Sequence, residues 1–215
     1  MGFAARAAAL LTATVTTSAS FRAVSTTGTT VKGETTIVEP RRGQARAALR
    51  AAEIKATVPE AHYTRRHEHT GSDAVIAAFA RALRTHPEAN AAYRDSRFER
   101  FERVNVAVTV TDAHGDEVAV TLFDADSMDA ATIVATRTEL AERAAAGELT
   151  APDSAGATAA VTDLTGTGVE TFTPLLTMLH TVCLGVTDSH LSLTCDARVL
   201  TARQAAALLD ATAEP

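Results

Sequence analysis

Two histidines, His67 and His69, have the residue type and the spacing to do chemistry. They lie in the segment 62–69, HYTRRHEH, whose alternation predicts a strand, and residues two apart on a strand point to the same side. Imidazoles placed in this way can ligate a metal ion or act as bases. A polar strand face that does neither is the simpler interpretation, and we predict no metal site.

A second pattern consists of four arginines that recur at every third position, Arg94, Arg97, Arg100 and Arg103. On one side of a helix, their guanidinium groups could bind a phosphate or an acidic carrier protein. Glu99 and Glu102 lie among them, so a solvated and ion-paired surface also explains the pattern. The ion-paired surface is the interpretation we prefer.

Cys183 and Cys195 are the only cysteines of the sequence, and each lies in an apolar strand pattern. We therefore expect buried free thiols in a reducing cytoplasm, without a disulfide or a metal site. The glycines of the GTG turn at 166–168 allow a close backbone approach. The helix that a dinucleotide-binding fingerprint requires does not follow this turn, so it is a weak signal for phosphate binding.

The composition sets outer limits on the function. The chain has 215 residues, of which 46% are hydrophobic and only 4% aromatic, so Ala, Val and Leu must fill the core. Its net charge of −6 argues against non-specific binding to nucleic acid or to an anionic membrane. The first twenty residues resemble a secretory signal, but we expect a helix or strand packed on the main body. No other apolar run has the length of a membrane span.

Strands and helices alternate along the chain and must position these residues. A β-ribbon or loop is expected over 21–32, and strands over 34–40, 62–69, 104–111, 118–123, within 156–172, and over 177–186 and 190–195. Helices are expected over 43–57, 73–84, 128–146 and 201–212. This order predicts an α/β or α+β fold.

From position 39 to the C-terminus, the motifs resemble the catalytic domain of the dihydrolipoamide acyltransferases of 2-oxoacid dehydrogenase complexes and their relative chloramphenicol acetyltransferase. VPEAHYT (58–64) is similar to the start of the family's Ala-Pro-His strand, and HPEANAAY (86–93) to its Pro-x-x-Asn element. Residues 104–150 resemble its long paired strands and the helix after them, and 156–186 its Gly-Gly-Thr-Phe-Thr-Ile-Ser-Asn-Leu-Gly block.

This resemblance implies a fold and a division of the chain. The fold would be a two-layer α/β sandwich of chloramphenicol-acetyltransferase type, with a mixed sheet and helices on one face. Residues 1–38 would form an N-terminal extension that packs on the body, and residues 39–215 the acyltransferase catalytic domain.

The most specific part of the resemblance lies near the C-terminus. The family ends in Asp-His-Arg-x-x-Asp-Gly and a helix, whereas this chain has Asp196, Ala197, Arg198 and Thr201. In the family the histidine is the general base for the thiol of coenzyme A or the acceptor hydroxyl, and the later aspartate helps to order the site. The resemblance thus implies catalytic positions at 197 and 201, but alanine cannot accept a proton.

The oxyanion donor of the family is matched elsewhere in the chain. Thr162 corresponds to the hydroxyl that stabilises the negative oxygen of the tetrahedral intermediate, and Asp163 stands at the family's asparagine. We assign Thr162 to catalysis. Asp163, His67 and His69 are assigned to substrate binding.

Three explanations of Ala197 stay open. The natural protein has histidine there and this chain is an inactivated variant, which would explain why Asp196 and Arg198 are retained. Alternatively, a natural member lost the base and serves as a non-catalytic scaffold. In the third explanation another residue, such as His67, His69 or His190, supplies the base from a different strand or a neighbouring subunit.

We expect a stand-alone relative, because the chain has no room for lipoyl-bearing and partner-binding domains. The resemblance to such members implies an acetyl-CoA-dependent O-acetyltransferase that acts on a small-molecule hydroxyl in tetronate-type polyketide biosynthesis. Acetyl-CoA would be the co-substrate, and a homotrimer is expected because the family builds its active sites between subunits. A structural pseudoenzyme of the same fold is the alternative.

Overall fold

The computed structural model describes residues 26–31, 33–68, 71–176 and 180–214. Residues 1–20, expected to pack on the body, lie outside these ranges. The chain divides into two compact units, Met1–Leu49 and Arg50–Pro215. In the first unit, β1 (Thr26–Thr30) and β2 (Gly33–Ile37) form an antiparallel ribbon. The sequence predicted a ribbon or loop over 21–32 and a strand over 34–40, but not the pairing of the two. Helix α1 (Arg42–Thr57) begins in this unit and ends in the second.

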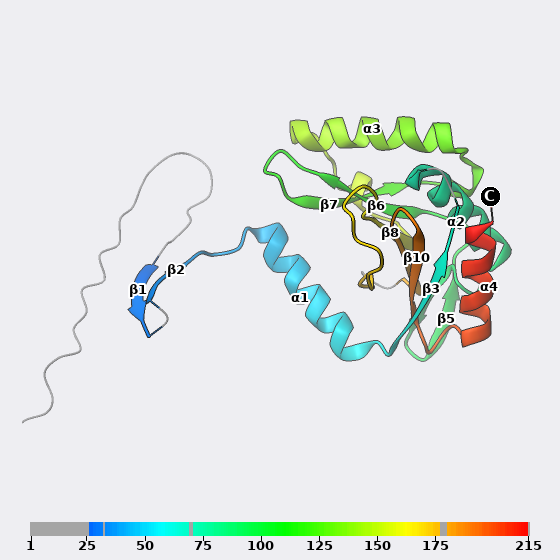
Figure 1. Cartoon of the computed structure of the whole chain (residues 1–215), viewed down its shortest axis with the longest axis horizontal. Helices are drawn as coiled ribbons and strands as arrows, with labels where there is room; N and C mark the ends of the chain where they lie inside the picture. Colours follow the sequence, from blue (N-terminus) through cyan, green and yellow to red (C-terminus); the bar gives the residue numbers. More distant parts are fainter. Residues whose placement is uncertain (1–25, 32, 69–70, 177–179, 215) are drawn as a thin grey trace, which may run out of the picture. The chain divides into compact units, whose positions relative to one another are not determined.

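A six-stranded sheet forms the centre of the second unit (Figure 1), in the order β3-β10-β9-β8-β6-β7. The strands are β3 (Glu60–Arg66), β6 (Val106–Thr111), β7 (Glu117–Leu122), β8 (Ala159–Asp163), β9 (Val182–Val186) and β10 (His190–Asp196). β8 runs parallel to both β6 and β9, and the other neighbours are antiparallel. The predicted mixed sheet is confirmed.

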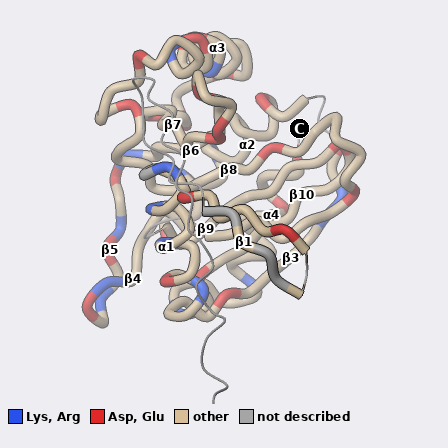
Figure 2. The backbone as a smooth tube through the Cα atoms, turned by 90° about the vertical axis from the view of Figure 1, so that its left-hand side faces the viewer, with Lys and Arg blue, Asp and Glu red and all other residues tan. Residues whose placement is uncertain are grey.

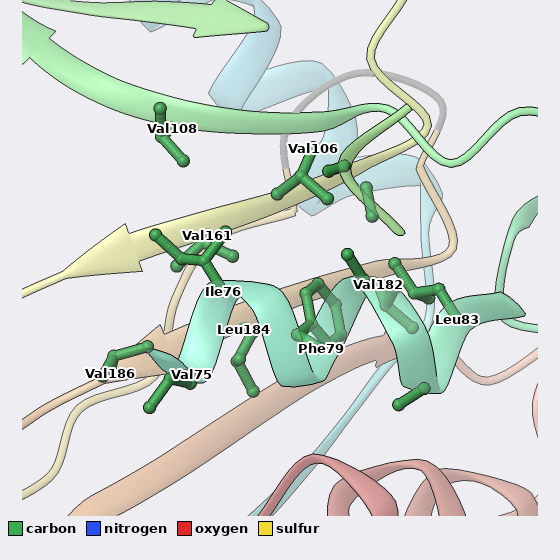
Figure 3. Packing of buried hydrophobic residues seen from close by; sticks show 14 of the residues in the cluster. Val75, Ile76, Phe79, Leu83, Val106, Val108, Val161, Val182, Leu184 and Val186 are labelled. Atoms are coloured by element: carbon green, nitrogen blue, oxygen red, sulfur yellow. The ribbon is translucent and has the colours of Figure 1, made fainter. Parts of the chain in front are cut away.

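Three helices cover one face of this sheet, namely α2 (Ser72–Thr85), α3 (Ala130–Ala146) and α4 (Ala202–Ala213). Helix α2 turns its apolar side toward the strands in Figure 3, where Phe79 lies among the valines and leucines of the sheet. Asp129 caps the start of α3 by accepting from the backbone of Thr132 at 2.8 Å. Gly147 ends it at a φ of 73°, which favours glycine. We call this side of the sheet the helix face.

The opposite side, which we call the polar face, carries small and polar side chains. Its members in the four strands β3, β10, β9 and β8 are Glu60, His62, Thr64, Ser192, Thr194, Asp196, Cys183, Gly185, Ala160 and Thr162. Part of it is covered by Leu176 and by Ile54 of α1. A Cβ at Gly185 would lie 2.7 Å from the ring of Phe172, so only glycine allows this ring to approach.

The segment from Arg94 to Arg103 is not helical, so the helical grouping of its arginines is wrong. β4 (Ala91–Arg94) and β5 (Arg97–Arg100) form a hairpin instead. Its turn uses Asp95 and Ser96 at φ values of 50° and 61°, and acidic and basic residues lie next to one another along it (Figure 2). Arg94 is 3.3 Å from the Glu99 carboxylate and Arg103 pairs with Asp124, which agrees with an ion-paired surface.

Two 3₁₀ helices, Ala125–Ser127 and Pro152–Ser154, precede α3 and β8. In the part of the chain that the structure describes, no helix combines the length and the apolar character that a bilayer span requires.

Candidate active site

The turn after β10 holds position 197 in a rigid frame. The buried carboxylate of Asp196 accepts from the backbone N of Arg198 at 2.9 Å and from its Nε and Nη2 at 2.9 and 2.6 Å. The guanidinium also lies 4.6 Å from the ring centre of Tyr93. Between these residues, the N–H of Ala197 donates to the carbonyl of Pro59 at 2.9 Å. The backbone is therefore held on both sides of a side chain that lacks a proton acceptor.

Thr162 lies near the C-terminal end of β8, on the polar face. Its Oγ1 is 3.9 Å from the sulfur of Cys183. Burial, together with the charge of Glu60, raises the pKa of the Cys183 thiol to about 12. The sulfur is therefore a protonated thiol at neutral pH, and it is not a nucleophile.

The two candidate positions lie at opposite ends of the sheet. Thr162 lies opposite Gly185 of β9, and Gly185 in turn lies opposite Ser192 of β10. Ala197 lies five residues beyond Ser192 and two strands away from β8. At about 3.3 Å per residue and about 4.8 Å per strand, the separation is about 19 Å. One chain therefore cannot place both side chains on the same reacting carbon.

The sequence profile described as "2-oxoacid dehydrogenases acyltransferase (catalytic domain)" matches residues 44–190, which is more than half of the chain. The chain belongs to this family. No curated protein matches the chain at a significant level. The predicted family resemblance is therefore confirmed, and the chain is an acyltransferase by membership.

Solved structures show that the acyltransferase has the fold of this family. The dihydrolipoamide acetyltransferase of Azotobacter vinelandii has a TM-score of 0.77 at 21% identity, over 85% of this chain and 93% of that one. A probable dihydrolipoamide acetyltransferase of Listeria monocytogenes has a TM-score of 0.76 at 18% identity, over 82% and 92%. A chloramphenicol acetyltransferase has a TM-score of 0.50 at 11% identity, over 76% and 92%. The predicted fold class is confirmed.

In the acyltransferase, Thr201 begins helix α4 as its N-cap. Its Oγ1 accepts from the backbone N of Gln204, and the Gln204 side chain accepts from the backbone N of Thr201 at 3.0 Å. This capping box satisfies N–H groups at the start of the helix. The hydroxyl therefore has a structural role, and a part in ordering the catalytic residues stays a prediction.

Asp163 is bound within the acyltransferase by its neighbours. It accepts from the N–H and the hydroxyl of Thr165 at 3.0 and 2.7 Å, and Arg137 lies 3.4 Å away. Burial opposes ionisation, but hydrogen bonds from Ser72 and Thr165 and the charge of Arg137 lower the pKa of Asp163. Its carboxylate thus joins β8 to α2 and α3, and a contact with substrate stays a prediction.

His67 and His190 lie at the end of the sheet opposite Ala197. His67 follows β3, and its Nε2 is 2.9 Å from the carbonyl of Thr187. His190 begins β10 with its Nδ1 2.8 Å from the hydroxyl of Ser189. Neither imidazole can reach position 197 of its own chain. As bases they would have to act on a site that a second copy completes.

The predicted pairing of His67 with His69 has no test here, because His69 lies outside the described residues. Among the residues that the structure does describe, no group of three His, Cys, Asp or Glu side chains could hold a metal ion.

Sequence reasoning missed one histidine, His62. It lies on the polar face directly opposite Thr194 of β10, and its Nδ1 is 3.0 Å from the Thr194 hydroxyl. The signal was present in the alternation of VPEAHYT and LSLTCD, whose polar positions face one another once the two strands are paired. Only the register of this pairing reveals the contact.

Proposed function

We propose that this acyltransferase moves an acetyl group from acetyl-CoA to the hydroxyl of a small molecule, in sites formed between the subunits of a homotrimer. The observation that carries the proposal is the separation of about 19 Å between Thr162 and position 197 on one sheet. An interface between two copies is the arrangement that joins them. Assembly is a property of at least one protein with this fold, the cubic core of the pyruvate dehydrogenase multienzyme complex.

In this mechanism the acceptor hydroxyl loses its proton to a base and attacks the thioester carbonyl. The Thr162 hydroxyl donates to the negative oxygen that forms, and collapse of the intermediate releases coenzyme A as a thiol. A general base contributes about 10²–10⁴-fold to such a reaction. With alanine at position 197, this contribution must come from another side chain or is lost.

The proposed acceptor is a tetronate-type hydroxyl, supported by the resemblance to stand-alone members of the family. In the dihydrolipoamide acetyltransferase of Azotobacter vinelandii, the roles of a serine, a histidine and an asparagine in catalysis have been investigated. The histidine and the asparagine are four residues apart there, as are Ala197 and Thr201 in this chain.

The decisive test is the substitution Ala197→His, assayed by coenzyme A release from acetyl-CoA in the presence of a hydroxymethyl tetronate. Turnover should be at least that of the unaltered chain and about 10²–10⁴-fold above that of a chain without any base, because a base then stands in the preserved frame of Asp196 and Arg198. Ala113→His, in an exposed turn, is the matched control and should change nothing. Absence of turnover with Ala197→His would contradict the proposal.

A non-catalytic scaffold is the second candidate, favoured by the lack of a proton acceptor at Ala197 and by the capping role of Thr201. It predicts a stable assembly in which neither the unaltered chain nor Ala197→His releases coenzyme A. Sedimentation tests the interface itself, because a homotrimer has three times the mass of the 22.4 kDa chain. A monomer would contradict both candidates.

A further inference from the structure

We propose that His62 is the general base of this chain and takes the place of the imidazole missing at position 197. This inference rests on the proposed acyl transfer and adds a catalytic residue to it. His62 lies on the polar face of the edge strand β3, with 41% of its side chain exposed. Ala197 binds the carbonyl of Pro59, three residues before His62 on the same chain segment. The two positions are therefore about 10 Å apart along β3.

A chain of two hydrogen bonds determines which nitrogen of His62 carries the proton. The buried hydroxyl of Thr194 is 2.6 Å from the carbonyl of Pro174. A carbonyl only accepts, so the single proton of Thr194 is used in this contact. The 3.0 Å contact between Thr194 Oγ1 and His62 Nδ1 therefore requires the proton on Nδ1. In the neutral ring, the lone pair must lie on Nε2.

The surroundings of Nε2 suit a base. The Oε2 atom of Glu60 is 3.9 Å from it, which is too far for a hydrogen bond and leaves the lone pair of Nε2 available. Glu60 is almost fully buried and pairs with Lys55 through Oε2. Its other oxygen, Oε1, has no hydrogen-bond partner among the described residues. The imidazole is thus held at Nδ1 by Thr194, while Nε2 makes no hydrogen bond, which is the arrangement that a general base requires.

In the proposed reaction, Nε2 of His62 both takes up and returns the proton. The acceptor O–H gives its proton to Nε2 as its oxygen bonds to the thioester carbon. When the intermediate collapses, the carbon–sulfur bond breaks. The leaving sulfur takes the proton from Nε2, which restores the neutral ring.

A double-mutant cycle of His62→Asn and Ala197→His separates a base from a structural histidine. The asparagine amide can still donate to Thr194 from the position of Nδ1, but it has no group at the position of Nε2. Coenzyme A release is measured with acetyl-CoA and a hydroxymethyl tetronate. His62→Asn should lower turnover by at least about 100-fold in the Ala197 chain. In the Ala197→His background it should have no effect, because the new imidazole replaces the base.

Other outcomes of the cycle overturn the proposal. An equal loss of turnover in both backgrounds would show that His62 has only a structural role. An unchanged rate in the Ala197 chain, or a loss with His190→Asn instead, would place the base elsewhere. If Ala197→His gains activity while the unaltered chain has none, acyl transfer stands and the role of His62 falls. If both are inactive, both proposals fall. The matched control is His114→Asn in the exposed β6–β7 turn, which should behave as the unaltered chain.

Two further measurements act as independent checks. Nitrogen-15 NMR of the histidine side chains should find the proton of neutral His62 on Nδ1, and a proton on Nε2 would overturn the proposal whatever the activity. Added imidazole should restore part of the turnover lost in His62→Gly. A histidine that only positions the loop at Pro174 would not be rescued in this way.

Discussion

The two faces of the six-stranded sheet are built from different side chains. The helix face holds large apolar residues such as Leu184 and Leu193, against which Phe79 of α2 packs, and all three are fully or almost fully buried. The polar face holds alanine, glycine, threonine and histidine, with hydrogen bonds where the helix face has dispersion contacts. Burial of apolar area dominates stability, whereas chemistry needs proton donors and acceptors. We therefore expect substitutions on the helix face to change stability and those on the polar face to change turnover.

Of the substitutions that test this difference between the faces, Phe79→Ala should lower the free energy of unfolding most. The ring has no exposed surface and lies at the centre of the core in Figure 3. Its removal should lower the free energy of unfolding by about 3–5 kcal/mol, measured by urea denaturation. Thr64→Ala, at an exposed position of the polar face, is the matched control and should cost less than about 0.5 kcal/mol. Similar losses in both variants would remove the distinction between the faces.

Gly185→Ala should cause an intermediate loss in the free energy of unfolding. The new Cβ would stand 2.7 Å from the Phe172 ring, so the ring must move away from the polar face. Overpacking of this kind costs about 1–3 kcal/mol, measured again by urea denaturation. Phe172→Leu added to Gly185→Ala should recover part of the loss, because the smaller side chain leaves room. If the double variant is no more stable than the sum of the two single losses predicts, the ring contact is not the cause.

Asp163→Asn should cause the smallest loss in the free energy of unfolding, and this loss should depend on pH. The pKa of Asp163 is lower in the folded chain than its ordinary value, so its ionised form stabilises the fold. This contribution is complete above the pKa of the unfolded chain, about 3.9, and is lost as the pH falls through the folded value.

At neutral pH, the loss in Asp163→Asn should be about 1 kcal/mol, since the ion pair with Arg137 is partly solvated. Urea denaturation of both proteins should give free energies of unfolding that converge as the pH falls toward 2. A difference that does not shrink in acid would mean that the charge of Asp163 is not involved.

Local patterns predicted much of the fold. The apolar spacing of residues 73–84 required a helix with one buried side, and Gly147 ended the next helix at a positive φ. The alternation in LSLTCD divided the residues of β10 between two faces. The hairpin at Arg94–Arg97 was missed. Its turn depends on left-handed conformations of Asp95 and Ser96, and the three-residue repeat of arginines gives no information about them.

Sequence by itself determined the family, the strand and helix order, and the absence of a proton acceptor at Ala197, since each depends on residue type and local spacing. Tertiary structure decided the rest. Strand pairing placed Thr162 and Ala197 at opposite ends of one sheet and set His62 against Thr194. Both relations depend on the register between strands, and β3 and β10 come from segments more than a hundred residues apart. A shift of one residue in such a pairing moves every side chain to the other face.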